Sequence, residues 1–193
     1  TGLSVNADGS RLLVNQRTGT SVSKLVITGQ DASLNLSANL QITNGNLSFN
    51  PSNNNELYWI SQEGLLRKVN IDKQTIGPVL AQNVVAMQPE GNQVYAVLRP
   101  DANSTKSTLW RIDTNSAKKT AVNIVIPQSP SYTLAFSADR AGDYLALLST
   151  ATKELIIIRS PSDDKPKTGL LSKTATAFSI SKNGQRIVYD SAN

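Results

Sequence analysis

The sequence predicts an all-β protein, and three observations carry this prediction. Apolar residues occur in short runs, for example residues 145–148 and 155–158, and several runs, such as 155–158, are rich in β-branched residues. Asp-Gly, Asn-Gly and Asn-rich segments, which favour tight turns, separate these runs. No helical periodicity persists over about eleven residues. We therefore expect short strands joined by hairpins.

The expected strands recur as a repeat. An apolar strand, a polar turn about six positions later and a second apolar strand occur five times. The copies begin at Leu3, Leu47, Val85, Phe136 and Phe178, at intervals of 44, 38, 51 and 42 residues. A period of about 40 to 45 residues is typical of a four-stranded propeller blade, so the repeat predicts a β-propeller.

The turn of each hairpin is predicted from its side chains. Asp8-Gly9 and Asn183-Gly184 tolerate positive φ and suit a tight hairpin. In the second copy residues 53–55, all Asn, are expected to form a weaker turn, and in the fourth Asp139 precedes the turn glycine by three residues. Because Asp8, Asp139 and Asn183 recur at the repeat period, we interpret them as turn residues rather than as catalytic groups.

Two further strands are expected in each blade. The third strands are predicted at residues 25–27, 65–71, 109–112 and 155–158, and weaker fourth strands at 35–42, 78–82, 121–126 and 168–171. Asp72 and Asp113 end two of the third strands. We expect their carboxylates to accept hydrogen bonds from N–H groups two residues on and to nucleate a turn.

The predicted organisation is a β-propeller with four complete four-stranded blades and the inner half of a fifth, in a single domain or fragment covering residues 1–193. The blades are expected at residues 1–44, 45–82, 83–132, 133–173 and 174–193. The fifth repeat contains two strands, and the sequence begins at Thr1. We therefore expect a piece of a longer chain whose further blades close the ring, or an arc that self-associates through exposed strand edges.

The repeat resembles those of bacterial WD-like, TolB-like and YVTN-type propellers. The resemblance rests on an apolar-Ser strand before a polar turn, as in Leu3-Ser4 before Asp8-Gly9, and on a later strand that ends in Ile112-Asp113. It implies a propeller fold in an extracytoplasmic protein of the bacterial envelope or cell surface. Separately, variable loops presented by rigid blades predict one or more protein partners.

Composition excludes several kinds of chemistry. The chain has no His and no Cys, so it lacks the commonest general base near neutral pH, thiolate nucleophiles and disulfides. Its net charge of +5 is spread over the repeats, whereas a nucleic-acid footprint needs clustered Lys and Arg. The longest apolar runs are far shorter than the roughly 20 residues of a membrane span. We expect no nucleic-acid partner and no transmembrane segment in this chain. The sequence is compatible with a membrane anchor outside it.

No catalytic, metal or cofactor site is predicted, and we do not expect an enzyme. Adjacent carboxylates at Asp163 and Asp164 are candidate calcium ligands, because calcium prefers oxygen. No series of alternating Asp residues and no following Glu accompanies them, so we favour a loop.

Four residues are candidates for ligand or partner contacts. Trp59 and Trp110 could stack on a ligand, although their apolar neighbours favour packing between blades. Arg99 and Tyr132 lie in the loops at residues 99–107 and 128–132, which we expect to face a partner.

These observations favour a non-enzymatic protein-interaction or scaffold module. One alternative is a carbohydrate-binding or glycan-processing propeller, which would be favoured by oligosaccharide binding that Trp59→Ala or Trp110→Ala abolishes. The other is a purely structural spacer, favoured if loop substitutions have no effect. Fold alone does not choose among these functions.

Overall fold

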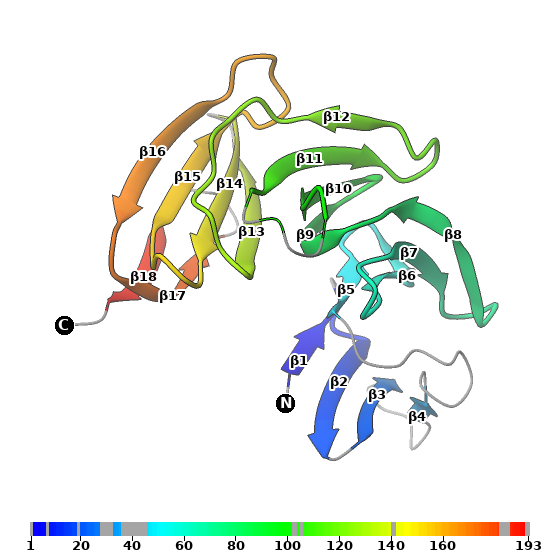
Figure 1. Ribbon diagram of the computed structural model, residues 1–193. Coiled ribbons are helices and arrows are strands. Elements are labelled where there is room, and N and C mark those ends of the chain that lie inside the picture. Colours follow the sequence, from blue (N-terminus) through cyan, green and yellow to red (C-terminus); the bar gives the residue numbers. More distant parts are fainter. Residues whose placement is uncertain are drawn as a thin grey trace. The chain divides into compact units, whose positions relative to one another are not determined.

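The computed structural model describes residues 2–6, 8–18, 20–27, 33–35, 46–101, 104, 106–139, 142–181 and 186–191. These residues form four four-stranded antiparallel sheets and one two-stranded sheet (Figure 1). The first sheet contains β1 (Gly2–Val5), β2 (Arg11–Thr18), β3 (Thr20–Ile27) and β4 (Ser33–Asn35), and the second contains β5 (Asn46–Asn50), β6 (Asn53–Ile60), β7 (Leu66–Asn70) and β8 (Thr75–Ala81).

The third sheet contains β9 (Val84–Glu90), β10 (Gln93–Leu98), β11 (Thr108–Asp113) and β12 (Lys119–Ala121). The fourth contains β13 (Tyr132–Asp139), β14 (Gly142–Ser149), β15 (Leu155–Arg159) and β16 (Lys167–Ser172), and the last contains β17 (Ala175–Ile180) and β18 (Ile187–Ser191). In every sheet, strands that follow each other in sequence are neighbours. No helix occurs within the described ranges.

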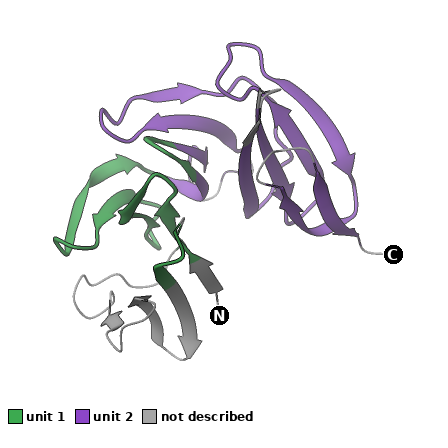
Figure 2. Ribbon diagram, turned by 180° about the vertical axis from the view of Figure 1, so that it is seen from behind, with its two compact units in different colours: residues 1–82, 89–93 green, residues 83–88, 94–193 purple. Residues whose placement is uncertain are grey.

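The chain divides into two compact units (Figure 2). The first comprises Thr1–Gln82 with Pro89–Gln93, and the second Asn83–Gln88 with Val94–Asn193. The second unit therefore holds the fourth and fifth sheets and all of the third except the β9–β10 turn and the strand ends beside it.

In the second, third and fourth sheets, the second strand is buried on both faces. All residues are buried at 57–60 in β6, at 94–97 in β10 and at 145–148 in β14. Because successive side chains of a strand point to opposite faces, a strand covered on both sides requires a continuous apolar run rather than alternation. The outer strands β12 and β16 are largely exposed, which explains the weaker sequence signal of the fourth strands.

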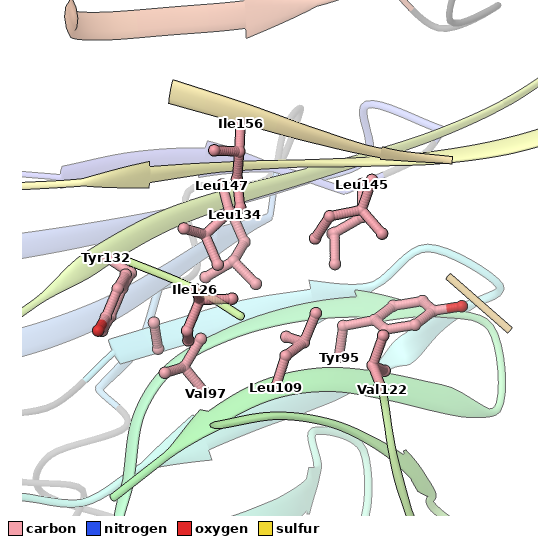
Figure 3. Close-up of a cluster of buried hydrophobic side chains, with 12 residues drawn as sticks. Tyr95, Val97, Leu109, Val122, Ile126, Tyr132, Leu134, Leu145, Leu147 and Ile156 are labelled. Atoms are coloured by element: carbon pink, nitrogen blue, oxygen red, sulfur yellow. The ribbon is translucent and has the colours of Figure 1, made fainter. Parts of the chain in front are cut away.

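A hydrophobic cluster joins the third and fourth sheets inside the second unit. Figure 3 shows Leu134, Leu145 and Leu147 of the fourth sheet pointing toward Val97 and Leu109 of the third. In the fourth sheet the pairs Leu134–Leu147, Leu147–Ile156 and Ile156–Leu170 are directly opposite across neighbouring strands. Residues that pair directly across neighbouring strands lie on the same face of a sheet. These pairs therefore form one row of apolar side chains on the face of the fourth sheet that carries the cluster.

The other face of the fourth sheet packs against β17 and β18. Ala146, Leu148 and Leu155 form a buried cluster with Ala175, and Phe178 and Ile187 pack against it. The fourth sheet is therefore apolar on both faces, as a sheet with a neighbour on each side must be.

The turn predicted at residues 53–55 is wrong in position. Asn50 pairs with Asn53, so Pro51 and Ser52 form the turn and Asn53 already belongs to β6. The Asn50 side-chain oxygen accepts a hydrogen bond from the Ser52 N–H at 3.0 Å. Asn before Pro at the first central position is a favourable turn sequence, because proline presets φ and Asn bonds the backbone two residues on.

One of the two predicted Asp turns is confirmed and the other is wrong. Asp113 accepts hydrogen bonds from the N–H groups of Asn115 and Ser116 at 3.0 and 2.8 Å. In the turn after β7 the acceptor is Asn70, which bonds the Lys73 N–H at 2.8 Å. Asp72 instead forms an ion pair with Arg11 at 3.1 Å.

The turn interpretation of Asp8 is confirmed by its contacts. Its carboxylate accepts hydrogen bonds from the Ser10 N–H at 2.9 Å and the Ser10 hydroxyl at 2.6 Å, and Gly9 has a φ of 75°. Asp139 pairs with Gly142 across the β13–β14 hairpin. Asn183 lies outside the described residues.

The hydrogen bonds at Asp8 give a prediction for its titration. The Ser10 hydroxyl and N–H hold the pKa of Asp8 below its usual range. A lowered pKa in the folded state means that the stabilisation is present above the unfolded-state pKa and is lost as the pH falls below about 4. Carboxyl-detected NMR should show this low pKa, and Ser10→Ala should raise it. An Asp8 pKa unchanged by Ser10→Ala would contradict the assignment.

The fourth strands begin and end differently from the prediction. β12 ends at Ala121, and residues 122–129 continue outside any strand, where a strand at 121–126 was predicted. β4 ends at Asn35, and the remainder of the predicted strand at 35–42 lies outside the described residues. The segment after β12 runs beside the fourth sheet and forms part of the site described next.

Candidate functional site

Three loops of the second unit meet at one end of its sheets. Antiparallel order places the β10–β11 loop, the β12–β13 connection and the β14–β15 loop at the same end. Arg99, directly after β10, donates hydrogen bonds to the carbonyl oxygens of Ser129, at 3.0 Å, and Pro130. Ser129 Oγ accepts a hydrogen bond from the Ala151 N–H at 3.1 Å. We call residues 99–101, 127–131 and 150–154 the loop end of the second unit.

Tyr132 holds the β12–β13 connection of the loop end in place. Its hydroxyl donates to the Pro127 carbonyl at 2.8 Å and accepts from the Ser129 N–H at 3.0 Å. Its ring is buried in the cluster between the third and fourth sheets. The sequence proposed Tyr132 as a partner contact, and the structure places its side chain inside, where it supports the loop rather than presenting a surface.

Arg99 lies between the loops with most of its side chain covered. Its main-chain N–H donates to the Asn83 carbonyl at 3.0 Å, and its buried Nε has no hydrogen-bond partner. It has no acidic partner among the described residues. The guanidinium therefore acts as a donor to main-chain carbonyls, and it joins the two loops that the sequence predicted to face a partner.

Removing the Arg99 side chain is expected to destabilise the loop end. Arg99→Ala should lower the free energy of unfolding by about 1.5 to 3 kcal/mol, the range for hydrogen bonds that involve a charged group. Hydrogen exchange of the Ser129 and Ser131 amides should quicken. Lys106→Ala is the matched control, since Lys106 is exposed in the same loop and its loss also removes one positive charge. Equal effects of the two variants would contradict the role assigned to Arg99.

The two tryptophans belong to different units. Trp59 of β6 is 8% exposed and packs with Leu47, Phe49 and Leu57 in the cluster of the second sheet. Trp110 of β11 is half-buried, and its indole N–H donates to the Thr108 hydroxyl at 2.7 Å. Trp59 thus offers little surface to a ligand, and Trp110 offers part of one ring.

The acidic pair Asp163–Asp164 lies in the exposed β15–β16 loop, where the Asp163 N–H donates to the Ser160 carbonyl. Among the described residues, no group of three or more potential His, Cys, Asp or Glu metal ligands occurs. That part of the chain also has no helix long and apolar enough to cross a membrane.

A groove of about 320 Å³ adjoins the loop end. It lies between β16 and the segment after β12, and no sequence pattern predicts it because its residues come from separate elements. Its lining consists of Val125, Ile126, Pro127, Glu154, Ile156, Thr168, Gly169 and Leu170. Val125 is 94% exposed and Leu170 is 50% exposed. The apolar run at residues 124–126 is the one sequence feature that points to the groove, but such a run by itself predicts a strand.

Comparison with solved structures identifies the fold. TolB from Acinetobacter baumannii matches over 100% of this chain and 49% of its own, with a TM-score of 0.71 and 12% identity. The beta-propeller domain of Cps50 (Swd1) from Myceliophteria thermophila matches over 98% of this chain and 60% of its own, with a TM-score of 0.58 and 15% identity. The fold is that of a β-propeller. The prediction of four complete blades and the inner half of a fifth is confirmed.

The propeller fold by itself identifies neither a family nor an activity. Hydrazine synthase from Kuenenia stuttgartiensis, an enzyme, also matches over 96% of this chain and 53% of its own, with a TM-score of 0.61 and 13% identity. No family model matches the chain, and no curated protein matches its sequence. The chain spans about half the length of TolB, and at these identities the likeness shows the fold alone.

Proposed function

We propose that this propeller is a non-enzymatic protein-interaction module that presents the loop end and the adjacent groove of its second unit to a protein partner. The observation that carries the proposal is the exposure of Val125 and Leu170 around an apolar groove. Contiguous exposed apolar surface beside polar residues is typical of protein-binding sites.

The hydrogen bonds of the loop end support the same function. Arg99, Ser129 and Tyr132 connect three loops through main-chain groups, so the surface is held in place before a partner arrives. A surface that is already ordered loses less conformational entropy on binding. Loops positioned by a rigid scaffold are the usual location of binding residues.

Site-specific photocrosslinking tests the proposal. A photoreactive residue at exposed Gln128 in the loop end should give a discrete protein adduct in the native host, identifiable by mass spectrometry. The control position is Asn115, which is exposed in the β11–β12 turn at the opposite end of the third sheet. The same adducts from both positions, or none from Gln128, would count against the proposal. Oligosaccharide binding abolished by Trp110→Ala would favour the carbohydrate alternative.

The proposed setting is outside the cytoplasm, in the bacterial envelope or at the cell surface. The resemblance of the repeat to TolB-like and YVTN-type propellers supports this setting, as does the similarity of the fold to TolB. Fractionation of the host with an antiserum to the chain checks it. Recovery with cytoplasmic markers would be the contrary result.

A further inference from the structure

We infer that the groove between β16 and residues 125–127 binds an extended peptide segment of a partner protein, with branched apolar side chains in the groove and a Lys or Arg beside Glu154. This inference rests on the proposed function and names the chemistry of the partner. Shape, backbone and charge support it separately.

The shape of the groove suits apolar side chains. Ile126 and Ile156 form its base, and both belong to the buried cluster between the third and fourth sheets, so the base is fixed by packing. Leu170 lies opposite Ile156 across the β15–β16 pair and therefore stands on the same face, forming one wall. Val125 stands exposed on the other wall. The volume is at the low end of the range for small-molecule pockets, and polar groups are few.

The backbone beside the groove suits an extended partner. Residues 122–129 belong to no strand. Within the described part of the chain, the main-chain groups of Val125 and Ile126 make no hydrogen bond. β16 is the last strand of the fourth sheet and has no strand on its outer side there. Unpaired main-chain groups at a sheet edge are the usual template for strand addition by a peptide.

The negative charge of Glu154 in the groove favours a cationic side chain on the partner. Among the described residues that line the groove, Glu154 is the one ionisable residue. Its carboxylate accepts a hydrogen bond from the Thr152 hydroxyl at 3.0 Å and has no cationic partner among the described residues. Glu154 lies directly before β15 and lines the groove together with Ile156. A Lys or Arg of the peptide would give this carboxylate its counter-charge while neighbouring apolar residues fill the groove.

Selection from a random eight-residue peptide library displayed on phage, with the 193-residue chain as bait, tests the inference. We expect enriched peptides with Val, Ile or Leu near one Lys or Arg. A synthetic fluorescent copy of the enriched peptide then serves as the probe in anisotropy titrations. Failure to enrich any sequence, or enrichment of acidic or wholly polar sequences, would overturn the inference.

Variants of exposed residues locate the binding without disturbing the core. Val125→Asp and Leu170→Asp should each weaken peptide binding at least tenfold, because each places a charge against the apolar side chains of the peptide. The matched control is Val188→Asp, since Val188 is 69% exposed on β18 and far from the groove in sequence. It should leave the affinity unchanged. Circular dichroism of all three variants checks that the sheets persist. Equal affinity of the groove variants and the control would overturn the inference.

Exchange of the charge tests the role of Glu154. Glu154→Gln should weaken binding about two- to fivefold, the range expected for a partly exposed ion pair. Glu154→Lys should favour a peptide in which Glu replaces the basic residue. An unchanged charge preference in Glu154→Lys would contradict the assigned role.

The two proposals can fail independently. A discrete Gln128 adduct in the host together with no peptide bound in the groove retains the interaction function and rejects the groove inference. Peptide binding that depends on Val125 and Leu170, without any adduct at Gln128, retains the groove and removes the loop end from the proposed surface. Concentration-dependent dimerisation abolished by Leu170→Asp, with no peptide bound, would assign the groove to a second copy of the chain instead.

Discussion

Leu147→Ala is expected to lower the free energy of unfolding by about 3 kcal/mol. Leu147 is fully buried on β14 and belongs to the cluster that joins the third and fourth sheets (Figure 3). Removal of a buried leucine side chain costs its transfer free energy and leaves a cavity, and together these amount to roughly 2 to 5 kcal/mol. Urea unfolding followed by circular dichroism measures the change.

The matched control for this experiment is Leu170→Ala. Leu170 lies in the same sheet, two strands from Leu147, but half of its side chain is already in solvent. Its replacement should cost less than about 1 kcal/mol, because little apolar area returns to water. Similar losses for the two variants would mean that the third and fourth sheets do not share the cluster described here.

Trp59→Ala is expected to lower the free energy of unfolding by about 3 to 5 kcal/mol, the usual cost of removing a buried aromatic side chain. Trp59 is in the cluster of the second sheet with Phe49, Leu57 and Val69. A tryptophan used for ligand stacking at the surface would cost far less. Chemical unfolding followed by circular dichroism therefore separates the packing interpretation from the ligand-binding one.

Trp59→Phe provides a sharper comparison at the same position. The indole Nε1 of Trp59 is buried without a hydrogen-bond partner, so the change to Phe removes no hydrogen bond and relieves an unpaired donor. We expect its cost to be less than half that of Trp59→Ala. A loss as large as that of the alanine variant would indicate that Nε1 does have an acceptor in the folded protein.

Most of the fold could be predicted from the sequence because it depends on local chemistry. Turn residues such as Asp8-Gly9 and Asp113 mark hairpins through their own side chains, and the apolar runs between them mark strands. The recurrence of this pattern at intervals of 38 to 51 residues then predicts the four-stranded sheets. Each of these features acts within a few residues along the chain, which is the range that a sequence pattern reports.

Errors arose where two neighbouring residues could serve the same local purpose. Asn50-Pro51 and the Asn run at 53–55 are both turn sequences, and the pairing of Asn50 with Asn53 decides between them. Asn70 and Asp72 could both accept a hydrogen bond from the following turn. The ion pair with Arg11, 61 residues away, engages Asp72 and leaves the turn to Asn70.

The sequence by itself determined the β-strand content, the repeat and the absence of His and Cys chemistry from these 193 residues. Tertiary structure alone decided which candidate residues are available to a partner. It buries Trp59 and Tyr132, uses Arg99 to connect loops and leaves Val125 and Leu170 exposed beside Glu154. The physical reason is that burial depends on which strands cover a side chain, and the strands that do so come from distant parts of the sequence.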